Sequence, residues 1–261
     1  MNVELLISTM NLSDPDKLLK REGVTGKSII INQITRQGGK AVQIDKGDHQ
    51  CFSYYEKGLS KSRNHAMEEA NGDICTLSDD DMTYCKDYEK LIQQAYDKYP
   101  NADIIAFSIL YPDGKEKRHL REGRVSLLMS MKINSAMITY RRSRIVDNNL
   151  KFDERFGAGS QYPWGEENIF LFDCIKRGLK LYYVPVVIGQ LQPSDSSWSR
   201  RNTPEHFKQM GAIYYRMSSK IYPLLIIQFA LRKRKQYIKE TDTITAIKSM
   251  FKGAKEFKEK E

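Results

Sequence analysis

The chain has 261 residues, which is enough for one large α/β domain or for one domain with an appendage. Its apolar content of 40% and charged content of 29% are typical of a soluble globular protein. Its four cysteines have no close CxxC spacing, which excludes the common cysteine zinc site, and we expect free thiols. Residues 1–10 lead straight into a strand pattern, so we expect no signal peptide and a cytoplasmic location.

The net charge of +9 is unevenly distributed. Residues 200–261 contain 15 Lys and Arg against 6 Asp and Glu, and the preceding residues contain 27 of each sign. We therefore expect a neutral domain over residues 1–200 and a basic helical extension over residues 201–261.

Apolar runs alternate with helix signals in the first 45 residues. Residues 3–8 and 28–32 are apolar runs of a type that favours buried parallel strands, and residues 41–44 predict a third, shorter strand. Between the first two, Ser13 or Asp14 followed by Pro15 predicts a helix start. Strand, helix and strand in this order indicate an α/β fold with a doubly wound sheet.

Three consecutive carboxylates stand at the end of a later strand. A helix after Gly58 ends at Asn71-Gly72, a strand over residues 73–78 follows, and residues 79–81 are all aspartate. Three like charges this close repel unless a cation or hydrogen-bond donors hold them. Strand ends in α/β sheets bind ligands, and carboxylates suit Mg²⁺ or Mn²⁺. The alternative is a solvated acidic turn.

Predicted helices and strands continue to alternate up to about residue 190. Residues 163–167 (PWGEE) follow a segment rich in glycine and aromatic residues and precede a predicted helix. Pro185 predicts an edge or a bulge in the last strand. The further predictions are helices at 86–99, 143–149 and 168–177, strands at 103–109, 133–140 and 181–188, and a loop or edge at 115–124.

The order of these motifs resembles the family 2 glycosyltransferases, bacterial-type enzymes of polysaccharide assembly. The resemblance covers residues 3–188 and rests on Ser-Thr-Met-Asn after the first strand, GLSKSRN, the triple aspartate and GEENIFLFDCIKRG before a strand. It implies the GT-A fold, a Rossmann-like, mostly parallel sheet flanked by helices. It also implies transfer of a hexosyl or N-acetylhexosaminyl group, with inversion, from a UDP-sugar to a glycan or lipid-linked acceptor.

The resemblance also implies which residues hold the donor. The family usually has an aspartate pair where this chain has Asn32-Gln33, and a Gln amide can still pair with a uracil edge because it both donates and accepts. The alternative for these two residues is a simple turn, and for Arg63 a solvated charge in the first helical turn. The implied donor-binding residues are Ser8, Thr9, Asn11, Gln33, Arg63 and Asp79.

A divalent cation, Mn²⁺ or Mg²⁺, is implied at Asp80 and Asp81. Such an ion stabilises the charge that develops on a departing nucleoside diphosphate. Many relatives add a metal-binding His after the strand that follows the acidic helix, whereas this chain has residues 189–192 (GQLQ) there.

By the same resemblance Glu167 is the general base, Glu166 is the reserve candidate, and Tyr162 and Trp164 bind the acceptor. A carboxylate near an aromatic ring has a pKa raised by desolvation, which makes it a better base near neutral pH. The alternative is that both glutamates are helix-start charges favoured by the dipole. Residues 194–201 are expected to form a lid, with Arg200 or Arg201 on the phosphates.

The basic extension contains a largely apolar run of 11 residues at 221–231, followed by four cations at 232–235. This run is too short to span a bilayer. A polybasic block beside an apolar stretch suits peripheral attachment to an anionic membrane, and the alternative is a helix packed on the catalytic domain. No interleaved aromatic platform is present, so we expect no nucleic-acid partner.

Two other functions compete with sugar transfer. A metal-dependent nucleotidyltransferase also uses paired aspartates, but it should carry a glycine-rich basic loop after its first strand, and residues 8–11 lack one. A catalytically silent sugar-nucleotide or membrane-binding module is the second alternative.

Overall fold

The computed structural model describes residues 1–116, 120–193 and 202–261. The chain forms two compact units, Met1–Ser194 and Asp195–Glu261, and each is described by itself. The boundary between them falls beside or within residues that the structure does not describe, so the predicted division at residue 200 stays a prediction.

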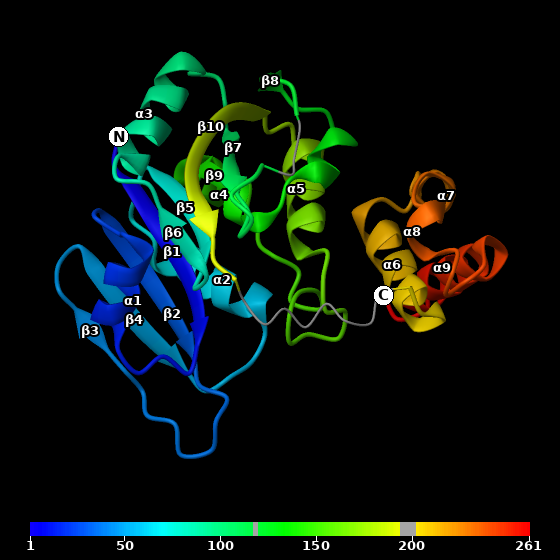
Figure 1. The fold of residues 1–261 in the computed structure, drawn as a ribbon, viewed down its shortest axis with the longest axis horizontal. Coiled ribbons are helices and arrows are strands. Elements are labelled where there is room, and N and C mark those ends of the chain that lie inside the picture. The colour runs from blue at the N-terminus through cyan, green and yellow to red at the C-terminus, as the bar shows by residue number, and fades with distance from the viewer. Residues whose placement is uncertain (117–119, 194–201) are drawn as a thin grey trace. The chain divides into compact units, whose positions relative to one another are not determined.

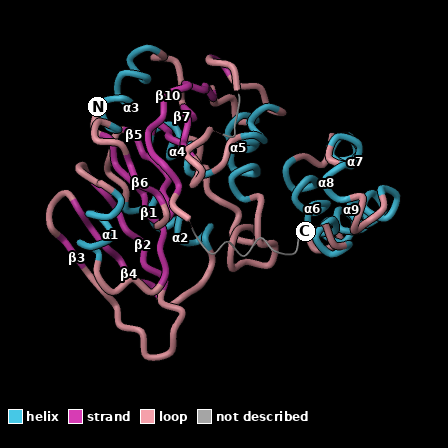
Figure 2. Tube along the Cα trace, in the orientation of Figure 1, coloured by secondary structure: helices cyan, strands magenta, loops and turns pink. Residues whose placement is uncertain are grey.

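The first unit is built on one mixed sheet of ten strands in its described residues (Figures 1 and 2). The spatial order is β3-β4-β2-β1-β5-β9-β7-β10-β6, with β8 paired to β10. The strands are β1 (Val3–Met10), β2 (Lys27–Gln33), β3 (Ile44–Asp45), β4 (His49–Tyr54), β5 (Ile74–Asp79), β6 (Met82–Tyr84), β7 (Ile104–Leu110), β8 (Gly123–Arg124), β9 (Ile138–Arg141) and β10 (Leu181–Leu191).

Helices flank this sheet, which confirms the predicted α/β class (Figure 1). Asp14 caps the first helix as predicted: its carboxylate accepts a hydrogen bond from the Lys17 backbone N–H at 3.0 Å, and Pro15 stands in the first turn. The helices are α1 (Pro15–Glu22), α2 (Leu59–Glu69), α3 (Tyr88–Lys98), α4 (Arg142–Asp147) and α5 (Glu166–Lys176), with 3₁₀ turns at η1 (Met129–Lys132) and η2 (Ser135–Met137).

The core lies on both faces of the central strands. β1 is buried from Val3 to Thr9, and β5 from Ile74 to Ser78. A strand covered on both sides needs a continuous apolar run, which explains why these two strands are clear in the sequence. Four neighbours, β4, β2, β1 and β5, are parallel, and β9 runs antiparallel between β5 and β7.

Three sequence predictions need correction. The strand predicted at 41–44 is wrong apart from Ile44. The neighbouring strand β4, which pairs with β2 and β3, was missed because its half-buried positions mix polar and apolar residues. The strand predicted at 133–140 is only β9, because the 3₁₀ turn η2 occupies Ser135–Met137. The helix predicted from residue 168 begins at Glu166.

The bulge predicted at Pro185 is confirmed. The pairing of β10 with β7 shifts register between Val184 and Val187, and Pro185 is exposed at that point. Proline has no N–H to donate to the ladder, so the strand leaves its regular pairing there.

The second unit contains α6 (Pro204–Met217), α7 (Tyr222–Arg232), α8 (Arg234–Tyr237) and α9 (Thr243–Lys258). Aromatic side chains such as Phe207, Tyr237 and Phe257 fill its core. The α6 and α9 helices approach so closely that a Cβ on Gly211 would overlap the backbone of Met250. No helix in the described part of the chain has both the length and the apolar character that a membrane span needs.

Candidate active site

The strand register brings the ends of four parallel strands together at one edge of the sheet. Ser8 of β1 lies opposite Asp79 of β5, and Met10 lies opposite Gln33 of β2. Gln33 in turn lies opposite Tyr54 of β4. The carboxyl ends of parallel strands are where α/β sheets bind ligands, so most of the predicted donor-binding residues share one edge.

Ser8 and Thr9 connect the first strand to its neighbours. The Thr9 hydroxyl donates to Asp80 Oδ2 at 2.6 Å, and the Ser62 hydroxyl of α2 donates to Ser8 Oγ at 2.8 Å. Both Ser8 and Thr9 are buried. Thr9 therefore fixes one oxygen of a predicted metal ligand.

Asn11 joins the loops that follow β1 and β2. Its backbone is in the left-handed region, with φ of 53°. Its Oδ1 accepts hydrogen bonds from the backbone N–H groups of Thr35 and Arg36, both at 3.0 Å, and its Nδ2 donates to Thr35 Oγ1 at 2.8 Å. Asn11 therefore holds the loop after β1 to the loop after β2 at this end of the sheet.

Gln33 holds the beginning of α2. Its Nε2 donates to the Gly58 carbonyl and to Glu56 Oε1, both at 3.0 Å, and its Oε1 accepts from the Gly58 N–H at 3.2 Å. It is the last residue of β2 and is buried, so the simple-turn alternative is wrong for it. Pairing with a uracil edge stays a prediction, and it requires Gln33 to exchange these bonds.

Arg63 joins the aspartate trio to the glutamate pair. Its Nη1 donates to Glu166 Oε1 at 2.9 Å, and its Nη2 donates to both oxygens of Asp79 at 3.0 and 3.2 Å. The guanidinium carbon also lies 5.5 Å from the centre of the Phe152 ring. Two segments 87 residues apart in the sequence are therefore held by one cation.

The burial of Arg63 corrects two expectations. It is the fifth residue of α2 rather than a first-turn residue, and only 1% of it is exposed, so it is not a solvated charge. Contact with a donor phosphate requires it to leave Asp79 or Glu166. A buried cation needs charged partners because desolvation alone is costly, and here it has two.

The three aspartates have different surroundings. Asp79 ends β5, and besides Arg63 it accepts a hydrogen bond from Ser135 Oγ at 3.4 Å. The backbone carbonyl of Asp80 accepts from Arg21 Nη2 at 2.5 Å. All three residues are half-buried, so the solvated-turn alternative does not describe Asp79.

Asp80 and Asp81 fit a divalent cation in the chemistry of their oxygens. Within the ranges that the structure describes, no group of three or more His, Cys, Asp or Glu is arranged to hold a metal. Mg²⁺ is commonly bound by one or two carboxylates together with substrate phosphates and water, which matches two aspartates at a strand end. The segment where relatives have a His also lies here, because the Gln192 N–H donates to the Asp81 carbonyl at 2.7 Å.

Glu166 and Glu167 form the first turn of α5 after Gly165, whose φ is 88°. Glu166 is buried against Arg63, whereas Glu167 is half-buried. Burial and the negative charge of Glu166 raise the pKa of Glu167 to about 8, against the opposing effect of Arg63. Glu166 is therefore occupied by an ion pair, and Glu167 has the raised pKa that suits a general base.

Tyr162 and Trp164 belong to the loop that borders the glutamate pair. The Tyr162 ring stacks on Phe156 with centroids 4.9 Å apart, and both Tyr162 and Trp164 are half-buried. In the same loop Gly157 has φ of 104°, and a Cβ there would lie 3.3 Å from Glu166 Cδ. This loop packs against Glu166, and its contact with an acceptor stays a prediction.

Sequence reasoning missed Glu22, a buried carboxyl group on α1. It is fully buried, neither oxygen has a hydrogen-bond partner among the described residues, and the nearest cation, Arg21, is 3.8 Å away. Burial is the main cause that raises the pKa of Glu22 to about 9, and the charges of residues 79–81 raise it further. Its place after Arg21 in an amphipathic helix gave no signal of burial.

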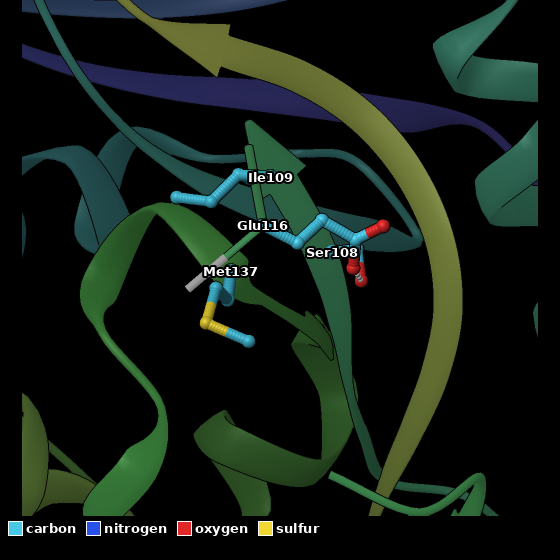
Figure 3. A pocket seen from close by; sticks show the side chains of 4 residues that line it. All are labelled: Ser108, Ile109, Glu116 and Met137. Carbon is cyan, nitrogen blue, oxygen red and sulfur yellow. Dashed lines mark hydrogen bonds between the residues drawn. The ribbon is translucent and has the colours of Figure 1, made fainter. Parts of the chain in front are cut away.

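A small pocket lies on β7, lined by Ser108, Ile109, Glu116 and Met137 (Figure 3). The Ser108 hydroxyl donates to Glu116 Oε2 at 2.6 Å. None of the predicted site residues lines it. The predicted lid, residues 194–201 with Arg200 and Arg201, lies outside the described residues.

Comparisons with known proteins bear on the family and the fold of the chain. The model of the family described as Glycosyl transferase family 2 matches residues 40–161. No curated protein matches the chain.

The fold is similar to solved structures of S. aureus TarS. The 1-349 fragment in complex with UDP-GlcNAc is 15% identical, with 95% of this chain and 82% of that chain covered and a TM-score of 0.60. The fragment without a named ligand is 13% identical, with 100% and 92% covered and a TM-score of 0.62. Its complex with UDP is 14% identical, with 92% and 75% covered and a TM-score of 0.55.

At these identities the likeness of structures establishes the fold, which is GT-A. The family match overlaps the predicted resemblance, contains α2 and the aspartate trio, and ends at residue 161, before the glutamate pair. Together they confirm that the chain resembles the family 2 glycosyltransferases, with the GT-A fold.

Proposed function

We propose that this protein transfers a sugar, with inversion, from a UDP-sugar to a hydroxyl group of a glycan or lipid-linked acceptor in surface polysaccharide synthesis. The family match supports a glycosyltransferase, and the similar TarS fragment is a complex with UDP-GlcNAc. A hexosyl or N-acetylhexosaminyl group is the proposed cargo.

The observation that carries the proposal is the Arg63 bridge. Asp79 at the end of β5 and Glu166 at the start of α5 bind the same guanidinium, at 3.0 and 2.9 Å. A donor whose ribose meets Asp79 is thereby placed beside the glutamate pair. Inverting transfer needs this proximity, because the base must reach the acceptor while the nucleoside diphosphate leaves from the opposite side of the sugar.

Glu167 is the proposed base. Its carboxylate takes the proton of the acceptor hydroxyl as that oxygen forms a bond to the anomeric carbon, and the bond from this carbon to the diphosphate oxygen breaks. The bonding electrons leave with the UDP. A general base is most effective when its pKa lies close to the working pH, and the pKa of Glu167, about 8, meets this condition.

Asp80 and Asp81 are the proposed ligands of Mn²⁺ or Mg²⁺. When bound, the ion supplies a Lewis acid for the diphosphate. Thr9 orients Asp80 through its 2.6 Å hydrogen bond, and Ser8, Asn11 and Gln33 shape the strand-end edge where the nucleoside is proposed to lie. Tyr162 and Trp164 are the residues proposed to bind the acceptor.

The test is a panel of nucleotide sugars, first for thermal stabilisation and then for turnover with Mn²⁺. A donor that binds the folded state raises the melting temperature. We expect UDP-sugars to stabilise the protein and to be hydrolysed slowly, and we expect Asp81→Ala to lose hydrolysis. Donor binding without hydrolysis or transfer would favour a silent module, and release of pyrophosphate from a nucleoside triphosphate and a sugar phosphate would favour a nucleotidyltransferase.

A further inference from the structure

One face of α7 exposes a row of large apolar side chains. Leu224, Ile227 and Leu231 are 62%, 39% and 64% exposed. Their spacing of three and four residues places them on one side of the helix. The opposite side holds Leu225, Ile226 and Ala230, which are at most 1% exposed. The helix is therefore apolar on two sides, and only one of them packs in the core.

This exposed row stands in a segment without negative charge. No Asp or Glu occurs from residue 206 to residue 239, whereas eight Lys or Arg do. Four of these, residues 232–235, follow Leu231 directly, at the end of α7 and in α8. Arg232, Arg234 and Lys235 are exposed. Apolar side chains and cations thus lie together at one end of the helix.

The charge pattern favours one kind of partner for the exposed face of α7. An anionic bilayer offers an apolar interior for the leucines and negative headgroups for the adjoining cations. A second copy of the same face would bring two sets of cations together, which opposes self-association. The helix has 11 residues, so it suits a position in the interface rather than a span.

We propose that the face of α7 formed by Leu224, Ile227 and Leu231, with the basic residues 232–235, docks on an anionic lipid bilayer. The apolar row enters the boundary between headgroups and acyl chains, parallel to the membrane, and the basic residues bind lipid phosphates. This inference is independent of the proposed sugar transfer.

The test is co-sedimentation of the full chain with phosphatidylcholine vesicles, with and without phosphatidylglycerol. We expect binding that requires the anionic lipid and weakens as salt increases, because exposed charges are screened. Leu224→Ser combined with Leu231→Ser should weaken vesicle binding at least about tenfold, since both side chains lose apolar area to bury. Arg234→Gln combined with Lys235→Gln should weaken it severalfold.

A matched control is Val146→Ser on α4, which also removes an apolar side chain that is 56% exposed but lies in the first unit. It should bind vesicles within about twofold of the wild-type protein. Circular dichroism establishes that each variant is folded. The inference fails if the wild-type protein does not bind anionic vesicles, or if the double leucine variant binds as well as Val146→Ser. If the wild-type protein forms a concentration-dependent dimer that the double leucine variant does not form, and does not bind vesicles, the partner of this face is a second copy of the chain.

Discussion

The two units use their charged residues in opposite ways. In the first unit, positive and negative residues balance, and the central ones are paired inside: Arg63 is buried between Asp79 and Glu166. In the second unit cations are in excess and many are exposed, beside an exposed apolar row. Buried paired charge fixes geometry, whereas an excess of exposed charge of one sign attracts a partner of the opposite sign. The comparison therefore separates the proposed chemistry of the first unit from the proposed docking of the second.

The largest effect should come from Glu167→Gln. The amide keeps the size of the side chain but cannot accept the acceptor proton, so the rate of sugar transfer should fall by about 10²- to 10⁴-fold. Donor affinity, measured by calorimetry, should stay within a few fold. Full activity in this variant would remove Glu167 as the base.

Replacing Arg63 tests whether buried, paired charge holds the site of the first unit together. Arg63→Met leaves the buried Glu166 carboxylate and half-buried Asp79 without their shared cation, and we expect the free energy of unfolding to fall by about 3–5 kcal/mol in urea titrations. Glu166→Gln in the same chain should restore part of that loss, because it removes one of the unpaired charges. If Arg63→Met is as stable as the wild-type protein, the bridge does not hold the two segments together.

Glu22 tests the burial of a carboxyl group that has no hydrogen-bond partner among the described residues. Its folded-state pKa of about 9 lies above its ordinary 4.5, so between these values the folded state holds a proton that the unfolded state has released. The stability of the wild-type protein relative to Glu22→Gln should therefore fall by about 1.4 kcal/mol for each pH unit above 5. Urea titrations of both proteins at pH 5 and pH 7 measure this difference. A pH-independent difference would mean that Glu22 reaches water or a partner.

The smallest effect concerns packing in the second unit. Gly211→Ala places a methyl group on the Met250 backbone, and the cost of overpacking should exceed the gain in helix propensity by about 1 kcal/mol. A lower melting temperature, followed by circular dichroism, is the expected result. A rise in melting temperature would show that α6 and α9 are less closely packed.

The sequence predicted the parts of the fold whose pattern is local. The buried strands β1 and β5 and the start of α1 follow from runs of apolar residues and from the Asp14-Pro15 cap. The strand β4 was missed, because its half-buried positions mix polar and apolar residues and give no continuous apolar run. Whether such a segment forms a strand depends on its pairing with strands that are distant in the sequence.

The candidate site was predicted as a set of residues but not as a network. The run of aspartates at a predicted strand end indicated Asp79, whereas Glu167 was predicted from the family resemblance at a helix start. The bridge through Arg63 depends on the distance between α2 and α5, which no local pattern carries. The burial of Glu22 likewise depends on what packs over α1.

The most direct test of the central claim is the pH dependence of sugar transfer by the wild-type protein. If Glu167 is the base and shares one site with the aspartate trio, kcat/KM for transfer from the UDP-sugar that binds best should rise with pH, reach half of its maximum at about pH 8 and level off above that pH, as Glu167 loses its proton. A profile that is flat from pH 6 to pH 9 would contradict the account.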